Sequence, residues 1–453
     1  MKKIRVLVVD DSEFLRRTLP RLLESDPEIE VVATAATGAE ALTKVRELRP
    51  DVVTLDVMMP DMDGLTALKH IMRDMPTPVV MVSMTTYEDA WETLEALALG
   101  AVDFITKPSG PTSLDIASRR AELVEKVHMA HAARDKVIGR MDTALTRLRE
   151  VREDLARSNS ETLAPLGQSG TGPLGKPWPS TGPLGRTTGD VEPPSERPKA
   201  GTGPLTPIKR DSGPLTLPET PVTGSSGLGS KSTGLLGRLP AAAPMLGEDG
   251  RPISGPEREL PPGGKRLVAI AASTGGPAAL QELLPRLPAT LDAGVVIVQH
   301  IAVGFTRPLA ERLHSLSGLE VVEAQDGAPI VPGIVLVAPA GLHLRVARQG
   351  KNLVAQISPE PTQARHKPAA DVLFRSIALC CAAEACAVLL TGMGDDGALG
   401  LRAIREAGGW TVAQDEATSV VWGMPRRAVE LGAVRALLAL EDIAAEIVRA
   451  TRK

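Results

Sequence analysis

The chain has 453 residues, 43% of them hydrophobic and 2% aromatic, and a net charge of −4. A single hydrophobic core rarely serves so long a chain, so we expect two domains with aliphatic cores. The nearly balanced charge argues against nucleic acid or an anionic membrane as the main partner, and no uncharged apolar run reaches the roughly 20 residues of a membrane helix. Three clustered cysteines, Cys380, Cys381 and Cys386, are typical of reduced core thiols and lack metal-ligand spacing, so we expect a cytoplasmic protein.

Short β-branched runs alternate with helical patterns over residues 4–110. This order is typical of a parallel sheet covered by helices on both faces. The expected strands are Ile4–Val9, Val31–Thr34, Val52–Leu55, Val79–Val82 and Val102–Ile105, and the expected helices include Phe14–Glu24 and Leu65–Met72.

Charged residues follow three of these strands. Asp10 and Asp11 follow the first, Asp56 follows the third, and Lys107 follows the fifth. Because the carboxyl ends of parallel strands meet at one edge, the three carboxylates repel one another unless a divalent cation joins them, and oxygen ligands favour Mg²⁺. Asp56 can then attack a phosphoryl group while the cation and Lys107 neutralise its charge. The alternative is that Asp10 and Asp11 only cap a helix and Lys107 is a surface charge.

These residues, together with Met58-Met59-Pro60, Asp63-Gly64, Ser83 and Phe104, resemble the receiver domain of two-component response regulators over residues 1–125. The resemblance implies a flavodoxin-like fold in which Asp56 accepts phosphate from a histidine kinase. It also implies that Asp10, Asp11, Asp56 and the carbonyl of Met58 hold Mg²⁺. Ser83 and Lys107 would contact the phosphoryl group, and Phe104 would change rotamer as the switch.

Two segments separate this region from the next α/β pattern. Residues 126–157 read as a charged helical extension whose apolar positions recur at three-four spacing, which suits either packing on a neighbour or a coiled coil. Residues 158–264 are rich in Gly, Pro, Ser and Thr, with Thr-Gly-Pro-Leu at 171, 181 and 202 and Ser-Gly-Pro-Leu at 212. We expect a disordered linker there, whose repeats are drifted low-complexity sequence or docking motifs.

Residues 265–453 alternate strand and helix patterns again, and they suffice for one further domain. The expected strands are Leu267–Ala271, Val295–Gln299, Ile334–Ala338, Ala387–Leu390 and Trp410–Ala413.

A serine, a histidine and an aspartate each follow one of these strands: Ser273, His300 and Asp396. A serine hydroxyl needs a base to become nucleophilic, and the base needs a carboxylate to fix its tautomer. Parallel strands can bring all three residues to one edge, and glycines around Met393 leave backbone N–H groups free to bind an oxyanion.

Several other interpretations remain open at this point. Ser273 can be a helix N-cap, or its glycine-rich turn can bind a phosphate. His300 can be a core histidine, with His343 and His366 as rival bases. Asp395 can replace its neighbour as the carboxylate.

The whole second domain resembles the catalytic domain of chemotaxis protein-glutamate methylesterases of the CheB type. The resemblance makes Ser273 the nucleophile, His300 the base, Asp396 its orienting carboxylate and the N–H of Met393 an oxyanion donor. It also implies a Rossmann-like three-layer fold. The matching segments are Ala271–Pro277, Gln299-His300 with Gly304-Phe305-Thr306, Ala338–His343, Asp371–Ser376, Leu390–Gly397 and Val421–Pro425.

The implied reaction is hydrolysis of glutamate γ-methyl esters on the cytoplasmic helices of methyl-accepting chemoreceptors, without a cofactor. Many family members also deamidate receptor glutamines, which these residues do not reveal. In the family an unphosphorylated receiver packs over the esterase site, and phosphorylation relieves the block.

Two departures from the family stand out. Ile301-Ala302 replace the usual Met-Pro after the histidine, which bears on receptor contact. The linker, with an r.m.s. span of about 55 Å, is longer than usual, so we expect weaker autoinhibition than in short-linker relatives. The competing functions are a catalytically idle signalling adaptor and a methylesterase of a non-chemotaxis receptor array.

Overall fold

The computed structural model describes residues 2–84, 86–107, 113–139, 266–360 and 364–452. The expected disordered linker and most of the expected helical extension lie outside the described residues. Within that extension, α5 (Ser113–Ala132) ends before a turn at Ala133, and the chain is helical again over residues 134–139. The described residues around both sheets belong to one compact unit.

The N-terminal region forms a five-stranded parallel sheet in the order β2-β1-β3-β4-β5. The chain runs from β1 to the edge strand β2 and then crosses back to β3, so the loops after β1 and β3 diverge. Open α/β sheets bind their ligands at such a switch point. The strands are β1 (Ile4–Val9), β2 (Ile29–Ala35), β3 (Val52–Asp56), β4 (Val79–Ser83) and β5 (Asp103–Thr106).

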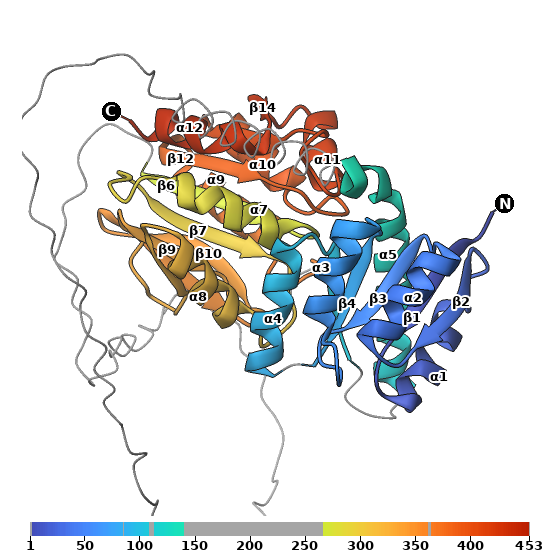
Figure 1. The fold of residues 1–453 in the computed structure, drawn as a ribbon. Helices are drawn as coiled ribbons and strands as arrows, with labels where there is room; N and C mark the ends of the chain where they lie inside the picture. Colours follow the sequence, from blue (N-terminus) through green and yellow to red (C-terminus); the bar gives the residue numbers. More distant parts are fainter. Residues whose placement is uncertain (1, 85, 108–112, 140–265, 361–363, 453) are drawn as a thin grey trace, which may run out of the picture. The chain divides into compact units, whose positions relative to one another are not determined.

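Five helices cover this sheet (Figure 1). Helices α1 and α5 contact each other, and α3 contacts both α2 and α4. The expected helices at Phe14–Glu24 and Leu65–Met72 are present with slightly different ends. The bounds are α1 (Glu13–Leu23), α2 (Gly38–Leu48), α3 (Gly64–Asp74), α4 (Tyr87–Ala98) and α5 as given above.

The C-terminal region forms a seven-stranded parallel sheet in the order β14-β13-β12-β6-β7-β9-β8. Its switch point lies between β6 and β12, because the chain builds β7, β8 and β9 on one side before it returns to β12 on the other. The strands are β6 (Leu267–Ala272), β7 (Gly294–Gln299), β8 (Glu320–Glu323), β9 (Ile334–Val337), β12 (Ala385–Leu389), β13 (Trp410–Gln414) and β14 (Ala436–Leu438).

The central strand β6 is buried on both faces, which explains its unbroken apolar sequence. Leu267, Ala269 and Ala271 point into one hydrophobic core. Val268, Ile270 and Ala272 point into the other. The sheet therefore separates two aliphatic cores, as expected for a doubly wound fold.

Helices cover both faces of the seven-stranded sheet. Helix α7 contacts α8 and α12, whereas α10 contacts α9 and α11. An antiparallel hairpin of β10 (His343–Gln349) and β11 (Asn352–Ser358) packs against α9 and was not predicted. The helices are α7 (Gly276–Leu283), α8 (Thr306–Leu316), α9 (Ala370–Cys380), α10 (Ala398–Glu406), α11 (Met424–Glu430) and α12 (Leu440–Thr451), with the short η1 (Leu284–Arg286) and η2 (Ala382–Glu384).

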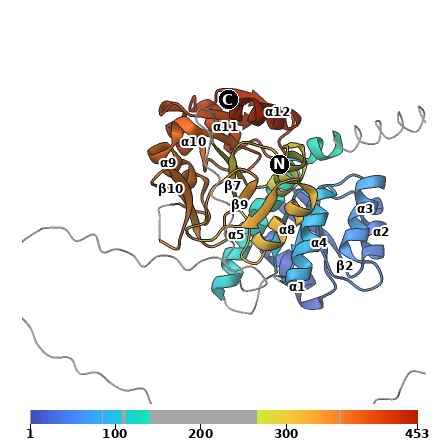
Figure 2. The ribbon, with the colours of Figure 1, turned by 90° about the vertical axis from the view of Figure 1, so that its left-hand side faces the viewer.

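Helix α4 beside the first sheet packs against α7 and α8 beside the second (Figure 2). At this contact the guanidinium of Arg312 lies 5.7 Å from the centre of the Trp91 ring. Among the described residues, no helix is long and apolar enough to cross a membrane.

Candidate active site and phosphorylation site

Ser273 stands at the turn that joins β6 to α7. Its N–H donates to the carbonyl of Thr391, 3.0 Å away. The N-cap of α7 is Gly275, with φ +76°, and no side chain caps this helix, so Ser273 does not serve as its cap. A Cβ on Gly275 would lie 2.7 Å from the side chain of Val420, so this left-handed turn requires glycine. The half-buried Ser273 is thus held at the strand tip.

His300 follows β7, the neighbour of β6. Ala272 and Gln299 are paired in the sheet, so the residues after them, Ser273 and His300, lie side by side at one edge. The Nε2 atom of His300 lies 2.8 Å from Oδ2 of Asp396. Its Nδ1 atom is buried and has no hydrogen-bond partner among the described residues. Since a carboxylate only accepts, Nε2 carries the proton and Nδ1 offers a lone pair.

Asp396 is anchored by the N-terminus of α9. The N–H groups of Ala370 and Asp371 donate to its two oxygens at 2.7 and 2.9 Å. Burial alone would raise the pKa of Asp396, but His300 and these two N–H groups together lower it. The carboxylate is therefore ionised and fixed in the orientation that His300 requires.

The loop from Thr391 to Gly397 brings a backbone N–H group near Ser273. A Cβ on Gly392 would lie 2.7 Å from Cβ of Ser273, so only glycine allows this approach. The next residue, Met393, is 39% exposed, and its N–H donates to no described group. This N–H is therefore available to a ligand.

The rival residues lie around this site rather than replacing it. Asp395 is exposed, and Asp396 is the residue that meets His300. His366 stacks on the ring of His300, with centroids 4.2 Å apart and planes 20° apart. Burial and the neighbouring His300 lower the pKa of His366, so a neutral ring covers one face of His300. His343 is fully buried at the start of β10.

Gln299 is a positioning residue whose role the sequence did not reveal. Its Nε2 donates to the backbone carbonyls of both Ser273 and His300, at 2.8 and 2.9 Å. The side chain is 2% exposed, and its Oε1 fills the space that a Cβ on Gly276 would need. One amide therefore sets the spacing of the two strand ends. The sequence feature that could have indicated this role is a polar residue at the end of an otherwise apolar strand.

We expect Gln299→Leu to lower kcat for the ester hydrolysis that the sequence predicts by about 10- to 100-fold, because the His300 carbonyl loses its donor, the Ser273 carbonyl keeps only the N–H of Gly276, and the two strand ends lose their link. KM should change much less. Steady-state methanol release measures both constants, and thermal unfolding checks the fold. The control is Gln356→Leu on the exposed face of β11. Equal losses in the two variants, or unchanged kcat in the first, would contradict the positioning role.

The first sheet has its own cluster of charged residues at its switch point. The ligand atoms of Asp10, Asp11 and Asp56 all lie within 4.8 Å of one another. The Nζ atom of Lys107 lies 2.6 Å from Asp56 and 3.3 Å from Asp10. Burial raises the pKa of Asp56 to about 6, although Lys107 opposes the shift. Such a crowded, desolvated set of carboxylates favours a bound cation.

The remaining residues predicted for this site line its surroundings. Ser83 is buried, and its hydroxyl donates to the carbonyl of Met84 at 3.1 Å. The hydroxyl of Thr93 donates to the hydroxyl oxygen of Ser83 at 2.8 Å. Met58 is half exposed, and its N–H donates to Asp56 at 3.3 Å. Phe104 lies on β5 and is buried.

Phe104 and its neighbour Asp103 contact the loops of the second sheet. The rings of Phe104 and Phe305 stack with centroids 4.4 Å apart. The hydroxyl of Thr274, the residue after Ser273, donates to Asp103 at 2.7 Å. Strand β5 therefore ends next to Lys107, and it begins at Asp103, which bonds the residue after Ser273.

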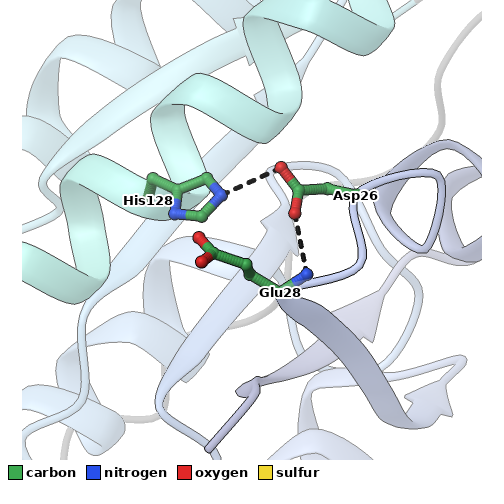
Figure 3. Close-up of side chains that lie close together, drawn as sticks. All are labelled: Asp26, Glu28 and His128. Carbon is green, nitrogen blue, oxygen red and sulfur yellow. Dashed lines mark hydrogen bonds and ion pairs between the residues drawn. The ribbon is translucent and has the colours of Figure 1, made fainter. Parts of the chain in front are cut away.

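A second group of ligand-type side chains, Asp26, Glu28 and His128, lies between α5 and the loop before β2 (Figure 3). Nε2 of His128 lies 3.2 Å from Asp26, whose other oxygen accepts from the N–H of Glu28 at 2.8 Å. These contacts attach α5 to the loop before β2, so the group has a structural role.

The chain matches two family models, "CheB methylesterase" over residues 268–447 and "Response regulator receiver domain" over residues 6–118. It is 41% identical to a protein-glutamate methylesterase/protein-glutamine glutaminase of Symbiobacterium thermophilum, covering 99% of this chain and 97% of that protein. It is 42% identical to a protein of the same name from Moorella thermoacetica, covering 98% and 97%.

Two solved Thermotoga maritima structures also match. The CheB methylesterase catalytic domain is 36% identical over 41% of this chain and 97% of that chain, with a TM-score of 0.40. The CheB response regulator domain is 49% identical over 29% and 98%, with a TM-score of 0.27.

The matches to the two full-length relatives correct one expectation. Because the alignments run along nearly the whole of both chains, this chain is about as long as these relatives. The linker of this chain is therefore not unusually long beside these two relatives. The expectation of weaker autoinhibition applies only to a comparison with relatives whose linkers are short.

Proposed function

The chain belongs to the family of CheB-type protein-glutamate methylesterases/protein-glutamine glutaminases, and on that premise we propose that Ser273 is its nucleophile, His300 its general base and Asp396 the carboxylate that orients the base. The observation that carries this proposal is the bond between Nε2 of His300 and Asp396, which leaves Nδ1 as the lone pair at the edge shared with Ser273.

Ser273 attacks the γ-carbonyl carbon of a glutamate methyl ester while Nδ1 of His300 takes the hydroxyl proton. The N–H of Met393 stabilises the oxyanion that forms. His300 then returns the proton to the departing methoxide, and methanol leaves an acyl-enzyme on Ser273. His300 deprotonates a water that attacks this acyl group; the bond to Oγ of Ser273 then breaks, His300 returns the proton to this oxygen, and the free glutamate leaves.

The same residues suit glutamine deamidation, the second activity in the relatives' name. The steps are identical except that the proton from His300 goes to an amide nitrogen, so ammonia leaves. The substrates we propose for both reactions are side chains on the helices of chemoreceptors in the cytoplasm.

Residues 1–125 serve as the receiver, and a histidine kinase is the phosphodonor for Asp56. Asp10, Asp11, Asp56 and the Met58 carbonyl would hold Mg²⁺. The buried Oδ2 of Asp10, which makes an ion pair with Lys107 but no hydrogen bond among the described residues, fits a cation ligand. The bound ion would neutralise charge on the phosphoryl oxygens. Lys107 and Ser83 would hold the phosphorylated carboxyl in place.

Strand β5 links phosphorylation to the esterase. Lys107 follows its end and bonds Asp56, while Asp103 and Phe104 at its start bond Thr274 and stack on Phe305. When the Asp56–Lys107 contact changes on phosphorylation, β5 and the Phe104 ring shift, and the contact beside Ser273 loosens.

We propose four segments in the chain. They are the receiver (1–125), the helical extension (126–157), the linker (158–264) and the catalytic domain (265–453).

Asp103→Ala should raise the methylesterase activity of the unphosphorylated protein about 10-fold, because the charged hydrogen bond from Thr274 is lost. The phosphodonor should then stimulate less than it does in the wild type. Asp26→Ala is a matched control, since each aspartate bonds a side chain of α5, Lys126 for Asp103 and His128 for Asp26. Identical basal rates in the wild type and Asp103→Ala would contradict control of the esterase through β5.

The proposed function is tested by measuring methanol release from methyl-labelled receptor fragments, with and without a small phosphodonor and Mg²⁺. We expect stimulation by the phosphodonor in the wild type and none in Asp56→Asn, whose unstimulated rate persists. Stimulation of Asp56→Asn would overturn the assignment of the phosphorylation site. Absence of methanol release under every condition would favour the idle adaptor.

A further inference from the structure

Two adjacent cysteines at the end of α9 bring their sulfur atoms together. Cys380 is the last residue of the helix, and Cys381 leaves it with φ −158° and ψ 25°. This change in backbone direction turns the second side chain toward the first, and the two Sγ atoms lie 3.1 Å apart. Both thiols are free in the structure.

A direct disulfide between these residues would be strained. Adjacent Cα atoms are separated by about 3.8 Å across a trans peptide, whereas disulfides span about 4.4–6.8 Å. A single atom inserted between the sulfurs enlarges the ring and relieves this strain. The pair is therefore better suited to share a bridging atom than to bond to itself.

The geometry also selects among bridging atoms. Two metal–sulfur bonds of about 2.3 Å to sulfurs 3.1 Å apart enclose an angle of about 85°, well below the roughly 109° of tetrahedral zinc. Among the described residues, no group of three or more ligand side chains includes this pair, so zinc would lack its usual four protein ligands. A trivalent centre with a lone pair is pyramidal, has narrow bond angles and needs only two thiols.

We propose that Cys380 and Cys381 form a chelating site for trivalent arsenic. With arsenous acid, two As–S bonds replace two As–O bonds, the two thiol protons leave with the two oxygens as water, and arsenic stays trivalent. The site does not depend on the proposed esterase mechanism, and nothing in that mechanism uses these residues.

Access and charge support the site. Cys380 is partly exposed, while Cys381 is 6% exposed, so the reagent meets Cys380 first and the second sulfur then closes the ring. The hydrogen bond between the thiols lowers the pKa of Cys380, and the positive charge of Arg348 adds to the effect. The guanidinium of Arg348 lies beside this site because it donates to the carbonyl of Cys380 at 3.4 Å.

The test uses phenylarsine oxide with the full-length protein and intact-mass measurement. We expect one phenylarsenic group per chain, with the oxygen and both protons lost as water. Excess monothiol should leave it bound and a dithiol should remove it, because the second As–S bond is intramolecular and strengthens retention by about 10²- to 10⁴-fold.

Cys380→Ser and Cys381→Ser should each lose the monothiol-resistant adduct, while the matched control Cys386→Ser should keep it. Thermal unfolding must show that each variant is folded, and Cys380→Ala replaces any that is not. Removal of the wild-type adduct by monothiol, or its persistence in a folded Cys380 variant, would overturn the proposal.

Discussion

Ser273→Ala is expected to reduce kcat for methyl ester hydrolysis by about 10⁶-fold, the size of effect that follows loss of a serine nucleophile. The reason is that Ser273 is the proposed nucleophile, at the tip of β6 beside the strand that ends at His300. The small side chain keeps the backbone bonds of residue 273 to Thr391 and Gln299, so the variant should fold and bind receptor fragments normally.

The measurement is steady-state methanol release by the phosphorylated protein, with thermal unfolding as the check on folding. Some activity above the rate in water should remain, because the oxyanion donor and substrate binding are untouched. Ser315→Ala in the exposed part of α8 is a matched control and should be fully active. Retention of even a hundredth of the wild-type rate by Ser273→Ala would rule out a serine mechanism at this residue.

Asp396→Asn should lower kcat by about 10⁴-fold, because His300 loses the negative charge that stabilises its protonated ring and can adopt the wrong tautomer. Ala370 and Asp371 donate their N–H groups to different oxygens of Asp396, so the NH₂ group of the amide meets one of these N–H groups in either orientation. Where the NH₂ group takes the position of Oδ2, it also faces Nε2 of His300, which must then accept, and the ring proton moves to Nδ1, where Ser273 needs a base. KM should change little, since the shape of the side chain is kept, whereas the melting temperature should fall because one backbone N–H loses its acceptor.

The neighbouring Asp395→Asn is the control, because that carboxylate is exposed and its loss should leave kcat unchanged. Both variants are measured by the same methanol assay. A larger loss in Asp395→Asn than in Asp396→Asn would reverse the assignment of the carboxylate.

The fold could be predicted where strands are buried on both faces. Runs such as Val295–Gln299 and Ile4–Val9 are almost wholly apolar because a central parallel strand meets a core on each side. The strands that were missed lie at edges or outside the sheets. Edge strand β8 has two glutamates among four residues, and β10 carries two arginines among seven, so neither resembles a buried strand.

The candidate site residues come to one edge because they follow neighbouring strands, and strand ends are visible in sequence. Other features depend on side-chain rotamers and on contacts distant in the chain. Three features are of this kind: the contact of Nε2 with Asp396, the two hydrogen bonds from Gln299, and the stacking of His366 on His300. The Thr274–Asp103 contact joins residues 171 positions apart, which no local pattern encodes.

The most direct test of the central claim is to trap the acyl-enzyme. The phosphorylated wild-type protein is mixed with a methylated receptor fragment, quenched with acid during the first turnover, digested and analysed by mass. We predict a receptor glutamyl group in ester linkage to the peptide that contains Ser273, and none in Ser273→Ala. An acyl group on any other residue, or rapid methanol release with no acylated peptide, would contradict the account.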